Sequence, residues 1–397
     1  LESNGHNVSY FNCLGHNATR SRKYGTGDFN STEISKPDLY SSIKRKYKLY
    51  GRPVAELKEF LENTPEFNLV CVGSMMTYWA RGVIETIHII RESRPEIPVI
   101  IGGIAAQLMP YYFKSHIENC ITGNLQSAEI SSLLQIKNLP DPSFIRGFRS
   151  LSAPVPHAPV VLSLGCPMRC TYCASSILQP SFRYRSLDIV VKEIEHMIKN
   201  FGVRDFAFYD DALLYKPEIV LIPFLKIIIE RKYSVRFHTP NGLHLRFLNE
   251  SILELMLKAG FTTLRFGYES GDFKYKQDTS GKIDQTELLK KIKLVKDNCS
   301  KQQDTGIYVM GGLRDQKPEQ MIEEMDFLGS LGIKVKPVFV SPVPGTTLYQ
   351  HYLKQFPLLS QDPLWHNDSF FITRLPGWNS EAVEAVRVKA KMINSRL

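Results

Sequence analysis

From residue 160 onward, short apolar segments alternate with helical segments, and this alternation constrains the fold more than any other feature of the chain. Parallel strands need a long crossover between them, usually a helix, so the repeat predicts an α/β fold with a parallel sheet. We expect six strands, at residues 160–164, 205–209, 234–238, 262–268, 306–310 and 335–340. Six strand–helix units fall short of the eight that close a complete barrel.

A similar alternation in the first part of the chain predicts a Rossmann-like, doubly wound domain over residues 1–138. Residues 1–5 resemble the last helical turn before a glycine, which predicts that this domain lacks its first strand. The polar stretch 15–60 is typical of an insertion, with a helix at 54–61. The expected strands are 8–14, 69–73, 99–103 and 120–123, and the expected helices cover 83–90 and 130–134.

The remaining boundaries follow from proline content and from helical periodicity. Residues 139–159 contain five prolines (Pro140, Pro142, Pro154, Pro156 and Pro159) and predict a linker between the two domains. The barrel is then expected over residues 160–345. Residues 346–397 predict a helical cap, in which an aromatic and polar loop precedes a final helix that starts at Ser380.

Three cysteines, Cys166, Cys170 and Cys173, lie within eight residues of one another, directly after the first expected barrel strand. A four-iron cluster takes one protein ligand per iron, so three cysteines leave one iron open to an exchangeable ligand. A structural zinc site or a disulfide is the alternative. Zinc needs a fourth Cys or His nearby, and neither Cys299 nor His157 is convincingly placed.

This spacing, with Tyr172 directly before the third cysteine, resembles the signature of radical S-adenosylmethionine (radical SAM) enzymes. The resemblance implies a 4Fe-4S cluster whose open iron binds S-adenosyl-L-methionine (SAM), with Tyr172 against the adenine. An electron from a reducing partner such as flavodoxin or ferredoxin would then yield a 5'-deoxyadenosyl radical. The resemblance also implies a partly open (β/α)6 barrel, a partial TIM barrel with its active site at the carboxyl ends of the strands.

Three other strand ends resemble SAM-binding segments of the same family. Tyr209, Asp210 and Asp211 match the segment that contacts the SAM ammonium group, although Asp211 could instead cap the next helix. Glu269 matches the residue that accepts hydrogen bonds from the ribose hydroxyls. Gly311 matches a glycine that lets adenine approach the backbone.

The chain departs from the family pattern after Gly311, where it reads Leu313-Arg314-Asp315 instead of Leu-Pro-Gly. This departure leaves the conformation of the following turn open.

Polar residues near the ends of the third and fourth strands are candidates for substrate binding. These are His238, Asn241 and Arg265. A lone histidine is more often a hydrogen-bonded structural residue, and Arg265 could equally be buried against a carboxylate.

The first domain resembles the cobalamin-binding domain that precedes many radical SAM modules. By that resemblance, five consecutive residues would border the corrin ring: Ser74, Met75, Met76, Thr77 and Tyr78. Gly102 and Gly103 would make room for the nucleotide tail. The chain lacks the histidine motif that ligates cobalt, and 123–129 departs from the family's Gly-Glu-Gly-Glu, so a related fold that binds nothing is the alternative.

Composition limits the remaining classes of function. The 397 residues are 43% apolar and 22% charged, and no apolar run approaches the length of a membrane helix. Scattered cysteines beyond the triplet are typical of a reducing cytoplasm, where we expect the protein to act. The net charge of +9 is spread along helices, so nucleic acid is an unlikely partner and a small molecule or peptide is the expected substrate.

These features predict a radical SAM enzyme, a cobalamin-dependent methyltransferase acting on an unactivated carbon. One alternative is a cobalamin-independent radical SAM oxidoreductase, cyclase or RNA-modifying enzyme. Another is a non-catalytic sensor that binds a cluster or cobalamin.

Overall fold

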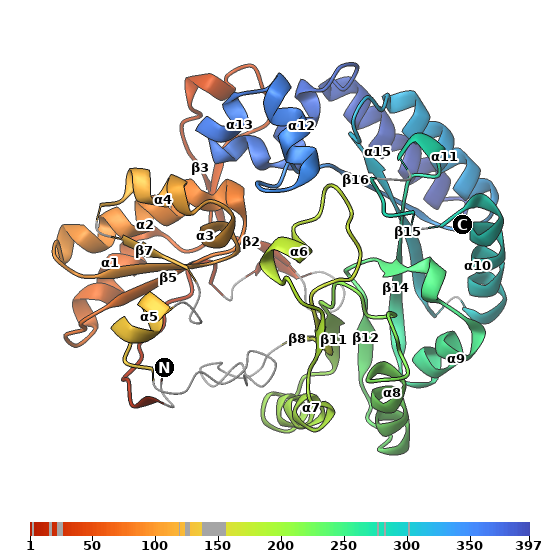
Figure 1. The fold of residues 1–397 in the computed structure, drawn as a ribbon, viewed down its shortest axis with the longest axis horizontal. Helices are drawn as coiled ribbons and strands as arrows, with labels where there is room; N and C mark the ends of the chain where they lie inside the picture. The colour runs from red at the N-terminus through yellow and green to blue at the C-terminus, as the bar shows by residue number, and fades with distance from the viewer. Residues whose placement is uncertain are drawn as a thin grey trace. The chain divides into compact units, whose positions relative to one another are not determined.

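The computed structural model describes residues 1, 4–15, 18–21, 27–118, 120–123, 128–136, 156–275, 278–281, 283–300 and 302–397 (Figure 1). The chain forms two compact units, Leu1–Pro140 and Asp141–Leu397. The boundary between them falls in the predicted linker, of which residues 139–155 lie outside the described part, as do 124–127 of the segment 123–129.

The first unit is built on a parallel sheet with the strand order β5 (Val70–Ser74), β6 (Val99–Gly103), β7 (Cys120–Thr122). These strands confirm three of the four predicted ones. On one face the sheet shares a buried core with α1 (Val54–Asn63), α2 (Ala80–Ser93), α3 (Ile104–Leu108) and α4 (Pro110–His116). On the other face Ile100 packs with Ile130 and Leu134, from and just after α5 (Ala128–Leu133).

The predicted strand at 8–14 is wrong. These residues pair with no strand in the described part of the chain, and the Asn12 side chain accepts a hydrogen bond from the Leu14 backbone at 3.1 Å, which bends the segment. Phe11 packs against Phe60 of α1, with ring centroids 5.2 Å apart. The segment therefore contacts a helix instead of extending the sheet.

The predicted insertion at 15–60 contains two small antiparallel sheets before α1. One pairs β1 (Ala18–Ser21) with β2 (Gly27–Phe29), and the other pairs β3 (Ser31–Glu33) with β4 (Lys48–Tyr50).

The second unit has six parallel strands in sequential order (Figure 1), and five of them confirm the predicted ones, whereas the first shares only Val160 with the predicted 160–164. They are β8 (His157–Val160), β11 (Asp205–Phe208), β12 (Arg236–His238), β14 (Phe261–Glu269), β15 (Asp304–Gly311) and β16 (Val335–Phe339). The helices between them are α7 (Leu187–Phe201), α8 (Leu221–Glu230), α9 (Glu250–Lys258), α10 (Gln285–Asn298) and α11 (Pro318–Ser330).

Side chains alternate between the two sides of this curved sheet. On the side that faces the helices, Phe206, Phe208, Phe237 and Phe261 form a buried aromatic cluster that includes Phe224 of α8. The alternate positions, among them Asp205, His238 and Thr263, face the barrel interior, which is therefore polar in its lower half.

The third strand extends beyond its predicted end at residue 238. After residues 239–242, β13 (Leu243–His244) pairs with β14 again, at Phe266 and Gly267. Pro240 has no N–H to donate to the ladder, which accounts for the interruption. The carboxyl end of this strand therefore lies near His244, and His238 lies below it.

The first barrel strand begins at His157, inside the predicted linker. Pro159 is tolerated because β8 is an edge strand of the sheet.

Residues 346–397 contain the helices α12 (Thr347–Gln355), α13 (Leu358–Gln361), α14 (Asp368–Phe371) and α15 (Ser380–Asn394), so the final helix starts at Ser380 as predicted, whereas α14 lies in the predicted loop. The cap of α15 is the Asn379 side chain, which accepts from the Ala382 backbone at 2.8 Å. The last helix packs on α11 and β16, and the Asn394 side chain bonds both backbone groups of Val335.

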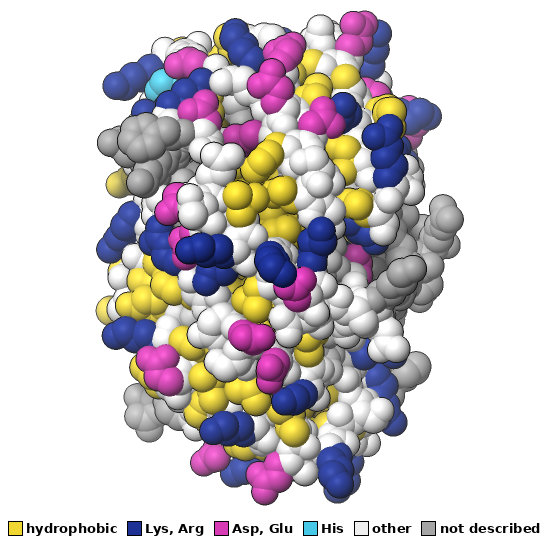
Figure 2. Space-filling view, turned by 90° about the vertical axis from the view of Figure 1, so that its right-hand side faces the viewer, with side chains coloured by type: hydrophobic (Ala, Val, Ile, Leu, Met, Phe, Trp, Pro, Cys, Tyr) yellow, Lys and Arg dark blue, Asp and Glu magenta, His cyan; other side chains and the backbone are white. Residues whose placement is uncertain are grey.

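No helix in the described residues has both the length and the apolar character needed to cross a bilayer. Figure 2 shows positively and negatively charged side chains interspersed over one face of the molecule.

Candidate functional site

The cysteine loop begins where β8 ends and is framed by a short antiparallel pair, β9 (Ser163–Leu164) with β10 (Arg183–Tyr184). Helix α6 (Ser175–Leu178) lies between the cysteines and β10. Gly165, directly before Cys166, has φ +81°, and a Cβ there would lie 3.0 Å from the Ser181 carbonyl oxygen and 3.2 Å from that of Gln179. Glycine is therefore needed to start the loop.

Cys166, Cys170 and Cys173 are all free and partly exposed. Burial raises the pKa of Cys166 to about 11, and the nearby charges of Cys173, Asp211 and Cys170 act in the same direction. The Cys173 Sγ lies 3.2 Å from the Ser175 hydroxyl. The three thiols are thus neighbours, which is the arrangement that a cluster with one thiolate per iron requires.

A single-ion site does not fit this loop. In the described residues, no group of three or more His, Cys, Asp or Glu side chains converges as the ligands of one metal ion do. A 4Fe-4S cluster takes one thiolate per iron, so the three cysteines of the predicted cluster need not converge on a single ion.

The Tyr172 hydroxyl is buried and makes no geometrically adequate hydrogen bond within the described part. Burial raises the pKa of Tyr172 well above its usual value, and the carboxylate of Glu269 adds to the shift. Tyr172 and Glu269, 97 positions apart in the sequence, therefore lie near one another at the barrel mouth.

The two adjacent aspartates after β11 have different environments. Asp210 is buried, and its carboxylate accepts from the Leu162 backbone at 3.0 Å, the Ser163 backbone at 2.6 Å and the Ser163 hydroxyl at 2.7 Å. Burial raises the pKa of Asp210 to about 6. Its side chain therefore fastens the start of the cysteine loop to β11.

Asp211 faces the cysteines instead. Burial raises its pKa, a hydrogen bond with Ser175 opposes that shift, and its charge raises the pKa of Cys166 and Cys173. The alternative that Asp211 caps the next helix is excluded, because α8 begins after Val220 and has no side-chain cap.

Tyr209 is half-exposed beside these aspartates, and the Asn241 amide donates to the Tyr209 carbonyl oxygen at 3.1 Å. Asn241 also lies 3.4 Å from the Asp210 carbonyl oxygen. The candidate substrate residue Asn241 thus supports the backbone of the segment expected to contact SAM.

Glu269 stands at a β-bulge, because the pairing of β14 with β15 shifts register between Gly267 and Glu269. Its φ is +68°, which is uncommon for a residue with a side chain, yet only 7% of it is exposed. Strain of this kind is concentrated at functional sites. The next residues are held by Glu324 of α11, which accepts from the Ser270 hydroxyl at 2.5 Å and the Gly271 backbone at 3.0 Å.

Gly311 has a packing reason for lacking a side chain. A Cβ at this position would lie 2.7 Å from Met321 Sδ, 2.8 Å from the Trp378 ring and 3.0 Å from Phe339. The contact that the sequence predicts between Gly311 and adenine would have to use the opposite side of the backbone.

His238 and Arg265 lie below the strand ends and are paired with protein groups. His238 Nε2 lies 2.9 Å from Asp205 Oδ1, and its Nδ1 lies 2.9 Å from the Thr263 hydroxyl. Burial lowers the pKa of His238, so the neutral form is favoured. Arg265 pairs with Asp304 at 2.5 Å, which agrees with the alternative prediction that Arg265 is buried against a carboxylate.

In the first unit, the strand ends of β5 and β6 are tied together by Ser74. Its hydroxyl donates to the Gly102 carbonyl oxygen at 2.7 Å and accepts from the Ala106 backbone at 3.0 Å. Gly103 has φ +93°, and a Cβ there would lie 2.3 Å from the Ser74 carbonyl oxygen. Residue 103 must therefore be a glycine, because any side chain there would collide with the Ser74 backbone.

Apolar side chains are exposed next to these strand ends. Met75 is 58% exposed, and Met76, Trp79 and Ile104 are each about 40% exposed, whereas Thr77 is buried and Tyr78 partly buried. A Cβ at Gly73 would meet no atom within 4 Å, and one at Gly102 would reach only the Gly123 carbonyl oxygen at 3.5 Å. The predicted cobalamin-binding residues thus border an open apolar surface.

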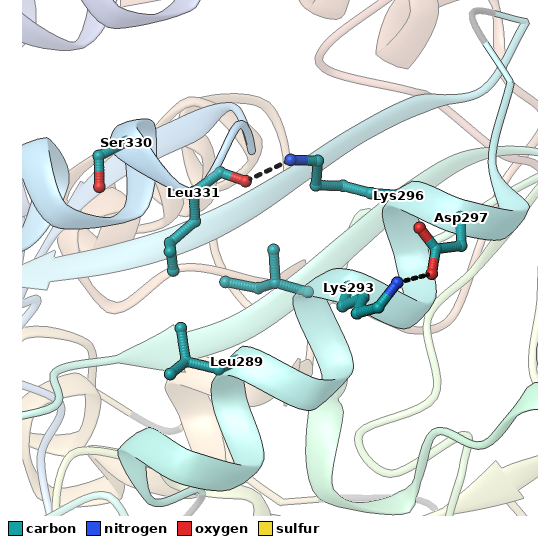
Figure 3. A pocket seen from close by; sticks show the side chains of 7 residues that line it. Leu289, Lys293, Lys296, Asp297, Ser330 and Leu331 are labelled. Carbon is teal, nitrogen blue, oxygen red and sulfur yellow. Dashed lines mark hydrogen bonds and ion pairs between the residues drawn. The ribbon is translucent and has the colours of Figure 1, made fainter.

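A separate surface hollow lies between α10 and the end of α11 (Figure 3). Its lining residues are Leu289, Ile292, Lys293, Lys296, Asp297, Ser330 and Leu331. The Lys296 ammonium group donates to the Leu331 carbonyl oxygen at 2.8 Å across it. The carboxyl ends of these helices lie at the amino ends of the strands, so the hollow is at the opposite end of the barrel from the cysteines.

Sequence reasoning missed Asp278, Glu324 and Thr171, which all hold the segments around the site. One feature of the sequence could have pointed to Asp278. Arg314, which departs from the family pattern after Gly311, pairs with Asp278 at 3.0 Å.

Residues 160–328 match the family model of the Radical SAM superfamily. Among curated proteins, the chain is 23% identical over 243 residues to an uncharacterized methyltransferase of Pyrococcus horikoshii, covering 59% of this chain and 50% of that protein. It is 23% identical over 235 residues to a cytidylyl-2-hydroxyethylphosphonate methyltransferase of Streptomyces wedmorensis, covering 57% and 43%. The matched parts thus span half or less of these two relatives.

Two solved structures have similar folds. The radical SAM methyltransferase TsrM of Kitasatospora setae, with cobalamin and a 4Fe-4S cluster bound, aligns with a TM-score of 0.64 at 14% identity, covering 84% of this chain and 81% of TsrM. The cobalamin-dependent SAM radical enzyme OxsB aligns with a TM-score of 0.52 at 13% identity, covering 77% and 49%. The family match and the cysteine loop after the first barrel strand show that residues 160–328 form a radical SAM domain.

Proposed function

We propose that this chain is a cobalamin-dependent radical SAM methyltransferase. The observation that carries the proposal is the meeting of the three thiols, Tyr172 and Glu269 at the carboxyl end of one parallel barrel. The names of similar proteins support methyl transfer, since the two curated relatives described above are methyltransferases.

In this proposal Cys166, Cys170 and Cys173 hold three irons of the cluster, and the fourth iron binds SAM. Asp211 is the carboxylate available to the SAM ammonium group, because the carboxylate of Asp210 is already occupied by the backbone at residues 162 and 163. Glu269 accepts from the ribose hydroxyls, and Tyr172 lies against the adenine. With one electron from a flavodoxin- or ferredoxin-like donor, the bound cluster and SAM would supply the radical chemistry that removes a hydrogen atom from the substrate.

Cobalamin is assigned to the open apolar surface of the first unit. Four apolar side chains are exposed close together beside two strand ends, and contiguous exposed apolar surface marks binding sites. Ligands of doubly wound folds also bind outside the carboxyl ends of the strands. Bound there, methylcobalamin would supply the methyl group that an unactivated substrate carbon receives. The proposal places no histidine on cobalt, because the chain lacks that motif.

The test is anaerobic reconstitution with iron, sulfide and hydroxocobalamin, followed by incubation with SAM and a one-electron reductant. We expect bound iron, bound corrin absorbance and formation of 5'-deoxyadenosine. Iron and 5'-deoxyadenosine without corrin would favour the cobalamin-independent enzyme. Bound cofactors without any 5'-deoxyadenosine would favour the sensor.

A further inference from the structure

A short turn at residues 278–280, between β14 and α10, holds the cysteine loop through three hydrogen bonds. The Asp278 carbonyl oxygen accepts from the Thr171 backbone at 3.0 Å, and its carboxylate accepts from the Thr171 hydroxyl at 2.7 Å. The Ser280 hydroxyl accepts from the Arg169 backbone at 3.0 Å. These contacts span more than 100 residues and end on both sides of Cys170.

The Asp278 carboxylate is only 1% exposed, and its counter-charge comes from a third loop. Arg314, after β15, places Nη2 3.0 Å from the same Oδ1 that accepts from Thr171. A buried carboxylate is retained only when it is paired and hydrogen-bonded. Arg314 stands where the sequence departs from the family pattern, so the departure supplies the cation that Asp278 needs.

The backbone on both sides of this contact is strained. Arg314 has φ +32° and Ser280 has φ +54°, values that residues with side chains rarely adopt. Strain persists only where surrounding contacts impose it, and it is concentrated at functional sites.

The fourth contact comes from the segment after β16. The Leu348 backbone donates to the Thr171 carbonyl oxygen at 2.9 Å. Every polar group of Thr171 is therefore engaged, by the turn after β14 and by the first turn of α12. These contacts therefore also fix the backbone positions of Cys170 and Tyr172, the residues on either side of Thr171.

The geometry points to Asp278, Arg314 and Thr171 as positioning residues that hold the cysteine loop and set the reduction potential of its cluster. None of the three contacts an iron in this assignment. Fixed charge near a cluster and solvent access to it are among the terms that set its potential. The carboxylate of Asp278 lowers the potential, and the guanidinium of Arg314 offsets it.

Two charge-changing variants test the electrostatic part. Asp278→Asn keeps the shape and an acceptor for Thr171 but removes a negative charge, so the midpoint potential should rise. Arg314→Gln removes a positive charge, so the potential should fall. Asp326→Asn, which removes a carboxylate paired with Lys389 between α11 and α15, is the matched control and should leave the potential unchanged.

The positioning part is tested on Thr171. Thr171→Ser keeps the hydroxyl and should resemble the natural protein, whereas the isosteric Thr171→Val should release iron to a chelator roughly five- to tenfold faster, the effect of one lost hydrogen bond. The electron paramagnetic resonance spectrum of the reduced cluster should also change in Thr171→Val and not in Thr171→Ser.

The readouts are iron content, the redox titration and the resonance spectrum, so turnover is not needed. The inference rests on the proposed cluster: a natural chain that binds no iron would refute the proposed function itself. Potentials of Asp278→Asn and Arg314→Gln that equal the control, or that shift in the same direction, overturn the electrostatic assignment. Equal iron release from Thr171→Ser and Thr171→Val, whether fast or slow, overturns the positioning role.

Discussion

Asp210 Oδ1 accepts a hydrogen bond from the Ser163 backbone at 2.6 Å, which fastens the end of the second barrel strand to the start of the cysteine loop. Its neighbour Asp211 faces the cysteines instead. Two adjacent carboxylates thus have two separate tasks.

The first prediction follows from this division. Asp210→Ala leaves the backbone groups of Leu162 and Ser163 and the Ser163 hydroxyl without their acceptor in a buried site, so the free energy of unfolding should fall by about 3 kcal/mol or more. Denaturant unfolding of the apoprotein measures the change.

Asp211→Asn is the matched comparison. It should leave the free energy of unfolding within about 0.5 kcal/mol of the natural value and raise the SAM dissociation constant about tenfold. Equal effects of the two variants on both quantities would contradict the division.

The second prediction uses the strained backbone of Glu269. Glycine adopts a φ of +68° without steric cost, so Glu269→Gly should not destabilise the fold through its backbone. The same change removes the proposed ribose contact, so the SAM dissociation constant should rise about ten- to a hundredfold.

Isothermal titration of the reconstituted protein, paired with thermal unfolding, separates the two effects. A folded Glu269→Gly variant with natural SAM affinity would reassign Glu269 to a structural role.

The third prediction concerns the cobalamin surface. Gly73→Val adds a side chain into open space on a strand, so the fold should persist while the corrin is excluded. Gly103 is a poor position for this test, because any Cβ there collides with the Ser74 backbone. Corrin absorbance after reconstitution is the measurement.

Gly82→Ala is the comparison, since a Cβ at that position on α2 also meets no atom within 4 Å. Full corrin loading of Gly73→Val would place cobalamin elsewhere.

The fourth prediction concerns pH. Burial lowers the pKa of His366 from 6.5 to about 4, although its Nε2 lies 2.8 Å from the Leu359 carbonyl oxygen. Between these pH values the unfolded chain binds more protons than the folded chain, so stability is full above about pH 6.5 and declines as the pH falls. The loss should approach about 3 kcal/mol near pH 4.

Urea unfolding followed by tryptophan fluorescence reports on this region, because Trp365, the residue before His366, is buried. His366→Gln, which does not titrate, should reduce the difference in stability between pH 7 and pH 4.5. A difference as large as that of the natural chain would exclude His366 as its source.

The parts of the fold that sequence predicts are those with a local cause. Most barrel strands contain an apolar run between helical segments, and the cysteine loop is contiguous, so both were predictable. The segment at 8–14 has a similar local pattern but packs on α1 through Phe11, and only the tertiary structure decides that.

The parts of the site that sequence misses depend on contacts between distant residues. Asp278 meets Thr171 across 107 positions, and Glu324 meets Ser270 across 54. The separate roles of Asp210 and Asp211 arise because neighbouring residues face different sides of the chain at the strand end. The interruption of the third strand at Pro240 moved its end away from His238 and toward His244.

The most direct measurement of the central claim is 5'-deoxyadenosine formed from SAM by the anaerobically reconstituted, reduced chain, with iron and sulfide determined on the same sample. The account predicts about four irons and four sulfides per chain and SAM-dependent product. Cys170→Ala should abolish both, and Cys299→Ala should preserve both. Zinc in place of iron, or product that persists in Cys170→Ala, would contradict it.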